Sequence, residues 1–269
     1  MSSKLLLDKT AIITGGSTGI GYAITLAFIS HGCTVIVNHL GRPQDAASLA
    51  ALHAAAADIQ RHDPQAGALH ELAGDVRQQA TAAALVSFAV ARSARGRLDV
   101  CVSNAGICEF AEFLTMGADL FADTLATNLT GSFFVVQAAG RQMARQVPPG
   151  GSIIGMSSIS ALVGGGRQAH YTPSKAGVLS LMQSAAVALG RYGIRCNAIL
   201  PGTIRTQLNE EDLRDERKRE YMEGRIPLGR TGDPKDVAGP AVFLACDMLS
   251  GYVTGAQLLV DGGLFVNLQ

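Results

Sequence analysis

Tyr171 and Lys175 are the pair of residues whose types and spacing best suit acid–base chemistry. They stand four residues apart, so on a helix their side chains share one face. Pro173 lacks an N–H and is tolerated only in a first helical turn, which places Tyr171 at the entrance of the helix. A phenol with a pKa of about 10 is a poor base at pH 7, and a neighbouring ammonium favours its phenolate. Because most such pairs are structural, the pair indicates a general base only together with further residues.

Ser158 supplies such a residue, thirteen positions before Tyr171 and after an expected strand. Ligands bind outside the carboxyl ends of strands in open α/β sheets, so we expect Ser158 to hold a substrate oxygen. The adjacent Ser157 is expected to point to the other face of the sheet. Ser160 and Gln168 are further candidates for contacting substrate hydroxyls. These residues together predict a site at one edge of a sheet.

A glycine-rich turn follows the first expected strand and precedes a helix. In a strand–turn–helix unit, glycines permit the turn and let a pyrophosphate approach the backbone at the helix N-terminus. The spacing is G-x-x-x-G-x-G, which differs from the commoner G-x-G-x-x-G. The turn predicts a cofactor phosphate site at Gly15, Ser17, Gly19, Ile20 and Gly21.

Short β-branched runs alternate with longer Ala- and Leu-rich segments along the whole chain. The expected strands are 10–14, 33–38, 68–73, 99–103, 151–156, 195–200 and 257–260. The expected helices are 19–31, 44–62, 78–95, 118–146, 171–192, 209–224 and 234–248. This alternation predicts an α/β fold: one Rossmann-like domain over residues 1–269, with a doubly wound parallel sheet of about seven strands and helices on both faces. The mixed charges of residues 210–223 are typical of a solvated helix face.

The composition of the 269 residues restricts the partners. Lys plus Arg and Asp plus Glu both number 22, which argues against nucleic acid or an acidic membrane surface and favours a small uncharged substrate. The five cysteines are scattered and the six histidines show no ligand spacing, so we expect reduced thiols and no metal. His170 is expected to be a packing residue rather than a base. The sequence shows no targeting or membrane segment, and we therefore expect a cytoplasmic protein.

The motifs resemble those of the short-chain dehydrogenase/reductase superfamily, in the same order and over essentially the whole chain. The resemblance assigns the glycine turn to a nicotinamide cofactor, Asp75 and Val76 to its adenine ring, and Asn104-Ala105-Gly106 to the sheet beside its ribose. It assigns the nicotinamide amide contact to Pro201, Gly202, Ile204 and Thr206.

The resemblance also implies roles in catalysis. Tyr171 removes the proton of a substrate hydroxyl, Ser158 holds the oxygen, and hydride passes to the nicotinamide ring. Lys175 binds the nicotinamide ribose and, with the positive ring, lowers the pKa of Tyr171; a change of about 3 units requires about 4 kcal/mol. Asn128 matches the asparagine that holds a water between Lys175 and solvent. Without the resemblance, we would interpret Asn128 as a residue inside a helix whose side chain hydrogen-bonds the backbone of that helix.

The choice between NAD and NADP depends on the residues after the second strand. No Asp or Glu occurs among residues 38–42 to bind the ribose 2′-OH and repel a 2′-phosphate. Asn38 and His39 are able to hydrogen-bond a hydroxyl pair, Arg42 is able to meet a phosphate, and Ser17 in the glycine turn is neutral. We expect NAD, with NADP also plausible.

Several segments, among them SSISALVGG (157–165) and HYTPSKAG (170–177), resemble the branch of the superfamily that oxidises the anomeric hydroxyl of L-rhamnose. The resemblance implies a neutral sugar as substrate and its lactone as product. The alternatives are another sugar 1-dehydrogenase, a ketone or oxoacyl reductase of the same superfamily, and a non-catalytic nucleotide sensor. The resemblance to a family whose members often form tetramers implies a homo-oligomer, a tetramer. We expect the ending FVNLQ to pack against a neighbouring subunit. The alternative is that this tail packs against the core of its own chain.

Overall fold

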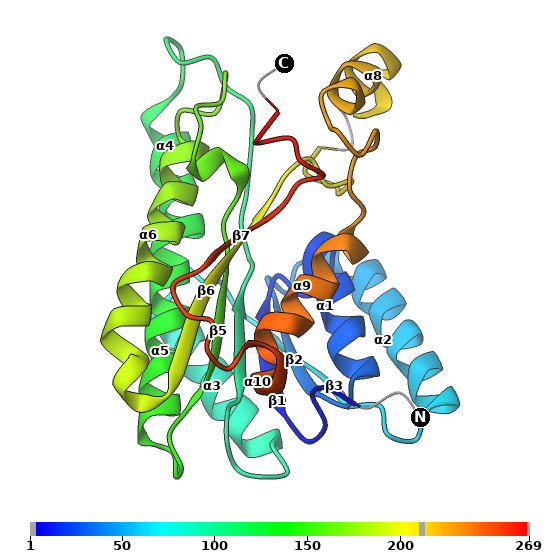
Figure 1. The fold of residues 1–269 in the computed structure, drawn as a ribbon, viewed down its shortest axis with the longest axis vertical. Helices are drawn as coiled ribbons and strands as arrows, with labels where there is room; N and C mark the ends of the chain where they lie inside the picture. The colour runs from blue at the N-terminus through cyan, green and yellow to red at the C-terminus, as the bar shows by residue number, and fades with distance from the viewer. Residues whose placement is uncertain (1–3, 210–212, 268–269) are drawn as a thin grey trace.

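Seven parallel strands form one sheet in the order β3-β2-β1-β4-β5-β6-β7, in a computed structural model that describes residues 4–209 and 213–267 (Figure 1). The strands are β1 (Thr10–Thr14), β2 (Thr34–His39), β3 (Leu69–Ala73), β4 (Val100–Ser103), β5 (Gly151–Met156), β6 (Ile194–Pro201) and β7 (Gln257–Val260). Every expected strand occurs, with bounds within one residue. The predicted doubly wound α/β fold is confirmed.

Helices cover both faces of the sheet, because the strands are apolar on both sides (Figure 1). Along β1, Ile13 packs into one buried cluster and Ile12 into the other, as the alternation of side chains in a strand requires. The first cluster contains residues of α1 (Gly19–Ser30), α2 (Asp45–His62) and α9 (Pro234–Ala245). The second contains residues of α3 (Gln79–Arg92), α5 (Gly131–Arg145) and α6 (Tyr171–Leu189).

The helix predicted over residues 118–146 is divided by a wider turn. It comprises α4 (Ala118–Leu125), one turn of π-helix, η1 (Ala126–Thr130), and α5. A π turn inserts one residue into the helical hydrogen-bond ladder, which periodicity of apolar residues does not reveal. Asn128 lies at the centre of this turn, so the irregularity falls on a predicted site residue.

The helices predicted over 78–95, 171–192 and 234–248 each end three residues earlier than expected, at Arg92, Leu189 and Ala245. Part of the helix predicted over 209–224 lies outside the described residues; its carboxyl part is α8 (Glu216–Gly224), where the Asp215 carboxylate accepts hydrogen bonds from two backbone N–H groups. The helix predicted over 234–248 begins at Pro234 after the Asp233 cap and ends at Ala245. Cys246 then adopts an extended conformation, and α10 (Asp247–Ser250) follows.

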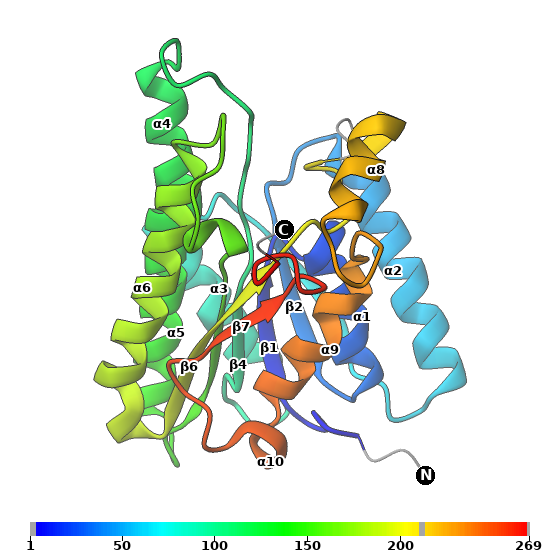
Figure 2. The same cartoon turned by 45° about the horizontal axis from the view of Figure 1, so that its top comes forward.

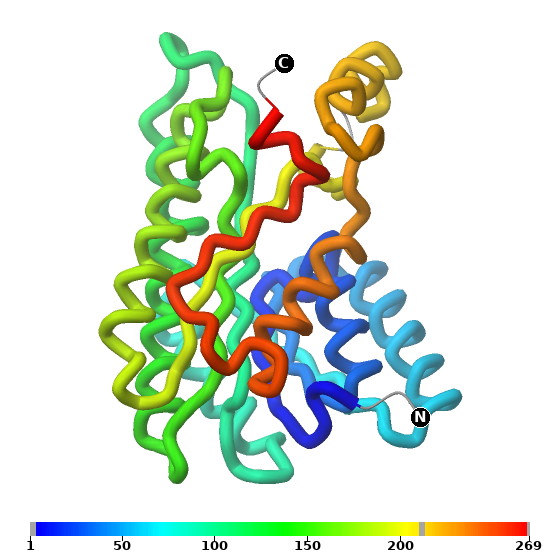
Figure 3. The backbone as a smooth tube through the Cα atoms, in the orientation of Figure 1, coloured from blue at the N-terminus to red at the C-terminus, as the bar shows by residue number. Residues whose placement is uncertain are grey.

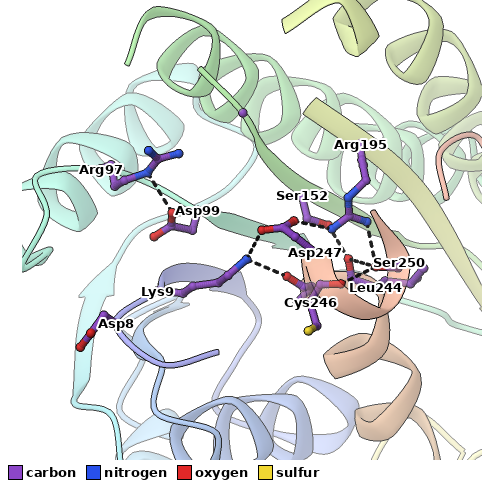
Figure 4. Close-up of polar contacts among 12 residues, drawn as sticks. Asp8, Lys9, Arg97, Asp99, Ser152, Arg195, Leu244, Cys246, Asp247 and Ser250 are labelled. Carbon is purple, nitrogen blue, oxygen red and sulfur yellow. Dashed lines mark hydrogen bonds and ion pairs between the residues drawn. The ribbon is translucent and has the colours of Figure 1, made fainter. Parts of the chain in front are cut away.

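A polar network occupies the amino ends of β1, β4, β5 and β6 (Figure 4). Asp99, just before β4, is 5% exposed; its Oδ2 accepts a hydrogen bond from the Thr10 N–H at 2.9 Å. Its Oδ1 pairs with Arg95 at 2.8 Å and with Arg97 at 2.9 Å. The two guanidinium groups compensate a carboxylate that would otherwise be costly to bury.

The same network fastens the sheet to the junction of α9 and α10. Arg195 of β6 donates hydrogen bonds to Ser250 Oγ and Asp247 Oδ1, both at 3.0 Å (Figure 4). Lys9 also pairs with the Asp247 carboxylate, and Ser152 Oγ donates to a carbonyl of α9 at 2.8 Å. These contacts lie at the opposite edge of the sheet from the predicted site residues, so we assign them to stability.

Ser250→Ala tests that assignment. Ser250 is 1% exposed, and its Oγ accepts from Arg195 and lies within hydrogen-bond distance of three carbonyl oxygens. We expect the free energy of unfolding to fall by about 1–3 kcal/mol in urea denaturation, because a buried donor loses its partner. Ser87→Ala, on the exposed side of α3, is the matched control and should change little. Equal stability of the two variants would contradict the assignment.

Candidate active site

A cavity of about 1040 Å³ opens at the carboxyl edge of the sheet, where open α/β sheets bind ligands. The residues after β1, β4, β5 and β6 form its floor and walls. α8 and the segment after β7 stand at this same end of the molecule (Figures 2 and 3). Of the predicted site residues, the cavity is lined by Gly15, Gly19, Ile20, Asn104, Ala105, Gly106, Ser158, Ser160, Gln168, Tyr171, Lys175, Pro201, Gly202, Ile204 and Thr206.

The glycine turn is held in place by the end of β4. Thr14 Oγ1 accepts hydrogen bonds from the backbone N–H groups of Asn104 at 2.9 Å and Ala105 at 3.0 Å. The Asn104 amide in turn donates to the carbonyl oxygens of Thr14 and Gly15. Gly15 has a φ of +61°, and a Cβ on Gly21 would lie 2.2 Å from the Gly15 oxygen. The turn therefore requires these glycines, and Thr14 is a supporting residue that the sequence analysis did not single out.

Ser158, Tyr171 and Lys175 meet at the floor of the cavity. Lys175 Nζ donates a hydrogen bond to the Met156 carbonyl at 3.0 Å and lies 5.6 Å from the centre of the Tyr171 ring. Ser158 Oγ accepts a hydrogen bond from the Ser160 N–H at 3.1 Å. Because Ser158 Oγ accepts in that bond, its O–H remains a donor, and it hydrogen-bonds the Tyr171 phenol oxygen.

Ser157 has a different role from its neighbour. Its Oγ donates a hydrogen bond to the Lys175 carbonyl at 2.8 Å, and the side chain is 3% exposed. The bond joins the end of β5 to the first turns of α6, which positions Lys175. Ser157 also lines the cavity beside Ser158, and its placement on the other face of the sheet stays a prediction.

Burial controls the protonation of the Tyr171 and Lys175 side chains. Burial raises the pKa of Tyr171, as does negative charge on the nearby Cys108 sulfur once it ionises, while the hydrogen bond with the Ser158 hydroxyl opposes the shift. Burial lowers the pKa of Lys175 from 10.5 to about 8. Both effects have one cause, since a dry environment disfavours the charged form of either group. The sequence analysis expects a low phenol pKa from Lys175 together with a positive nicotinamide ring; without that ring, the net shift of the Tyr171 pKa is upwards.

Asn128 is 1% exposed, and its side chain forms hydrogen bonds with residues outside its own helix. Its Nδ2 donates to the Ile107 carbonyl and to Ser174 Oγ, both at 3.0 Å, and its Oδ1 accepts from the Ile107 N–H at 2.8 Å. A Cβ on Gly106 would lie 3.2 Å from Asn128 Oδ1 and 3.3 Å from Lys175 Nζ. The glycine therefore keeps the space between these two polar groups open.

The structure uses Asn38 differently from the prediction. Asn38 is 2% exposed, and its amide nitrogen donates to the carbonyl of Gly74 at 2.8 Å and to that of Leu72 at 3.3 Å. The side chain thus joins the ends of β2 and β3 instead of facing the cavity. His39 Nδ1 accepts a hydrogen bond from the Gly41 N–H at 3.0 Å, so local turn geometry occupies this nitrogen.

Four other predicted cofactor residues lie outside the cavity lining among the described residues. Ser17 is 7% exposed within the turn, and Gly21 packs against the turn's backbone. Val76 belongs to the second buried cluster. Asp75 accepts a hydrogen bond from the Arg77 N–H and pairs with its guanidinium, which lowers the pKa of the carboxyl group.

Some lining residues had no signal in the sequence. Cys108 and Phe110 come from the loop after β4, and Tyr221 and Met222 come from α8. The sequence analysis predicts a solvated helix face there, and α8 has in addition a side that faces the cavity. The sequence pattern of one segment does not show which other segments lie next to it in the folded chain.

Residues 261–267, after β7, contact their own chain, whereas Leu268 and Gln269 of the ending FVNLQ lie outside the described residues and its packing on a neighbouring subunit stays a prediction. The Asp261 carboxylate accepts hydrogen bonds from the N–H groups of Gly263 and Phe265, and Leu264 is 9% exposed. Asn267 donates to a carbonyl beside α8 at 2.9 Å. Leu264 and Phe265 therefore help to line the cavity.

The fold, the glycine turn and the Ser–Tyr–Lys arrangement define a class of oxidoreductase. The sequence model of the family described as "Enoyl-(Acyl carrier protein) reductase" matches residues 15–265. A short-chain type dehydrogenase/reductase from Mycobacterium marinum superposes with a TM-score of 0.86 at 34% identity, over 96% of both chains. The chain belongs to the short-chain dehydrogenase/reductase family.

Two relatives resemble the chain more closely over its full length. It is 57% identical to the Scheffersomyces stipitis protein named L-rhamnose-1-dehydrogenase, over 98% of this chain and 99% of the relative. It is 54% identical to the Sphingomonas protein named L-rhamnose 1-dehydrogenase (NAD(P)(+)), over 99% of this chain and all of the relative. The predicted resemblance to this branch of the family is confirmed.

The residues present fit a nicotinamide dinucleotide. Gly15 and Gly19 place bare backbone on one wall of the cavity, at the N-terminus of α1, where phosphates bind. A Cβ on Gly19 would already lie 3.3 Å from Thr206 Cγ2 on the opposite wall. Across the residues that the structure describes, no group of three or more His, Cys, Asp or Glu side chains forms a metal site, and no helix is long and apolar enough to cross a membrane.

Lys175→Met tests the burial of the lysine. Between pH 8 and 10.5 the unfolded chain holds a proton on Lys175 that the folded chain has released, so this group raises the free energy of unfolding as pH rises through that window. Below pH 8 the buried ammonium costs stability. We expect Lys175→Met to be more stable at pH 7 by about 2 kcal/mol in urea denaturation, with the gain shrinking towards pH 10.

Lys235→Met is the matched control, because the exposed Lys235 side chain is hydrated in both the folded and the unfolded chain. It should show no such pH-dependent difference. A Lys175→Met protein that is less stable than the parent at pH 7 would contradict the cost assigned to burial.

Proposed function

We propose that the protein oxidises the anomeric hydroxyl of L-rhamnose to L-rhamnono-lactone, with NAD(P)⁺ as hydride acceptor, as the first step of a non-phosphorylated route of rhamnose breakdown. The observation that carries the proposal is the buried Ser158–Tyr171–Lys175 arrangement at a large cavity, in a chain 57% identical to a protein named L-rhamnose-1-dehydrogenase. A protein of zero formal net charge, with the hydroxyl and amide groups of Ser158, Ser160 and Gln168 in its cavity, suits a neutral sugar.

In this mechanism Tyr171 is the general base and Ser158 holds the reacting oxygen. The proton of the C1 hydroxyl passes to Tyr171 Oη, while the C1–H bond breaks with its electron pair and C1 becomes a carbonyl carbon. The Ser158 O–H, which the Ser160 bond leaves available, donates to the substrate oxygen. The bound nicotinamide cofactor supplies the hydride acceptor and a positive charge beside the phenol.

Lys175 has two tasks in the proposal. Its ammonium holds the cofactor ribose and stabilises the Tyr171 phenolate, which opposes the effect of burial on the phenol. The space beside Gly106, between Asn128 Oδ1 and Lys175 Nζ, suits a water molecule with partners on both sides. Asn128 thus supports a route by which the proton leaves for solvent.

For the cofactor we propose NAD with NADP as a second acceptor. No acidic residue occurs among residues 38–42 to repel a 2′-phosphate, and Arg42 is exposed beside this strand end. Asp75, Val76 and the residues of the glycine turn remain candidates for the adenine and phosphate groups. The relative named with NAD(P)(+) supports the use of both cofactors.

We propose that Ser160 and Gln168 hydrogen-bond the ring hydroxyls of the sugar, because both line the cavity with Ser158 and Tyr171. We also propose that residues 1–269 act as one cytoplasmic domain. The five cysteines, all within the described residues, form no disulfide, which supports that location. We also propose a homo-oligomer, a tetramer. Exposed apolar side chains on α4 and α5, such as Phe121 and Phe133, support it because a subunit interface would cover them. Light scattering measures the number of subunits.

Tyr171→Phe tests the base. The phenyl ring keeps the shape of the site but offers no oxygen for the proton, so kcat should fall by about 100- to 10 000-fold. The dissociation constant of NADH, followed by its fluorescence, should stay within about two-fold of the parent value. Tyr252→Phe changes a fully exposed tyrosine and should leave kcat unaltered. Retained turnover in Tyr171→Phe would exclude the assignment.

Initial rates with a substrate panel test the reaction itself. We expect L-rhamnose with NAD⁺ or NADP⁺ to give reduced cofactor and a lactone, at a higher kcat/KM than other aldoses. The reverse assay offers simple ketones and 3-oxoesters with NADH or NADPH. Faster turnover of oxoesters would favour a reductase instead, and cofactor binding without any turnover would favour a nucleotide sensor.

A further inference from the structure

Two loops over the cavity are joined to each other by contacts that the catalytic residues do not need. They follow β4 (residues 104–117) and β5 (residues 157–170). The Ala111 N–H donates to the Arg167 carbonyl at 3.0 Å, and the Arg167 guanidinium pairs with Glu112 at 3.1 Å. Arg167 has a φ of +63°, which is uncommon for a residue with a side chain. The backbone there is held by its contacts on both loops.

The Gln168 side chain lies at the inner end of this junction. Its Nε2 donates to Cys108 Sγ at 3.6 Å, across the gap between the two loops. Its Oε1 occupies the space above Gly165, where a Cβ would come within 2.2 Å of it. The amide nitrogen is therefore bonded to a thiol of the other loop, while the amide oxygen fills the space left by the missing side chain of Gly165.

The same residue is rigidly connected to the proposed base. The Gln168 carbonyl accepts hydrogen bonds from the N–H groups of Tyr171 and Thr172, both at 2.9 Å. Its own N–H donates to the Gly165 carbonyl at 3.1 Å. One tight turn thus carries both the amide and the phenol, so their separation varies little. A carboxamide has two N–H donors and two acceptor lone pairs, and the bond to Cys108 uses one donor.

We propose that Cys108 and Gly165 are specificity-determining positioning residues that hold the Gln168 amide against one ring hydroxyl of the sugar. The inference rests on the proposed sugar oxidation and adds to it the reason for selectivity among sugars. An amide fixed in place rejects a sugar whose hydroxyl is missing or inverted, because the bound sugar then covers the amide N–H or C=O from water without giving it a partner. A loosely held amide would turn to water and discriminate less.

A double-mutant cycle of Cys108→Ala and Gln168→Ala separates positioning from direct contact. Cys108→Ala should raise KM for L-rhamnose by about five-fold, leave kcat within about two-fold and reduce the preference for L-rhamnose over epimers with one inverted ring hydroxyl. In the Gln168→Ala background the same change should have no further effect, since there is no amide left to position. Cys108→Ser, which retains an acceptor, should recover part of the selectivity.

Gly165→Ala and Gly166→Ala form a second, matched pair. A methyl on Gly165 must displace the amide, which costs little folding stability because the atom it meets is the end of a flexible side chain. A methyl on Gly166 meets nothing within 4 Å. We expect selectivity to fall in Gly165→Ala and to persist in Gly166→Ala, with equal melting temperatures and equal NADH dissociation constants.

Two results would overturn the inference. The first is that KM and selectivity are unchanged in both Cys108→Ala and Gly165→Ala. The second is that Cys108→Ala lowers selectivity just as much when Gln168 has already been replaced by alanine. Neither result bears on whether the parent enzyme oxidises L-rhamnose, which the substrate panel decides. If the parent instead prefers an oxoester, the proposed function fails while the geometry of Cys108, Gly165 and Gln168 remains.

Discussion

The chemistry of the site depends on one costly placement, an amine buried beside the tyrosine ring at the floor of the cavity. Burial disfavours the charged form of each, so it raises the pKa of Tyr171 and lowers that of Lys175 to about 8. In the folded chain the Met156 carbonyl holds the lysine amine at 3.0 Å. Such a pair costs folding free energy, and proteins retain this kind of cost where chemistry requires a shifted proton affinity.

The two edges of the sheet divide stability and chemistry between them. At the amino edge, Asp99, Arg195 and Asp247 have hydrogen-bonded partners on neighbouring elements (Figure 4). At the carboxyl edge, backbone and polar groups face a cavity instead. A parallel sheet makes this division natural, because all its strands end at the same edge. A well-packed amino edge can stabilise the domain without restricting the loops that meet the substrate.

Much of this architecture follows from local patterns. Short β-branched or apolar runs predicted the strands, and most of these runs are continuously apolar because strands covered on both faces need apolar residues on both. The position of Pro173 placed Tyr171 at the start of α6, where it is found, and the spacing to Lys175 put both side chains on one face. The glycines at 15, 19 and 21 predicted the turn after β1. Each of these inferences uses only residues that are near one another in the chain.

The sequence by itself determined the strands, the glycine turn and the order of the Ser, Tyr and Lys residues. Only the tertiary structure decided that Asn38 joins β2 to β3, that Asn128 sits in a π turn behind Gly106, and that Cys108 meets Gln168. Sixty residues separate the last pair, and α8 and the segment after β7 reach the cavity from still farther along the chain. The physical reason is that hydrogen bonds and packing between distant segments depend on how the loops fold over the sheet, which leaves no periodic trace in either segment.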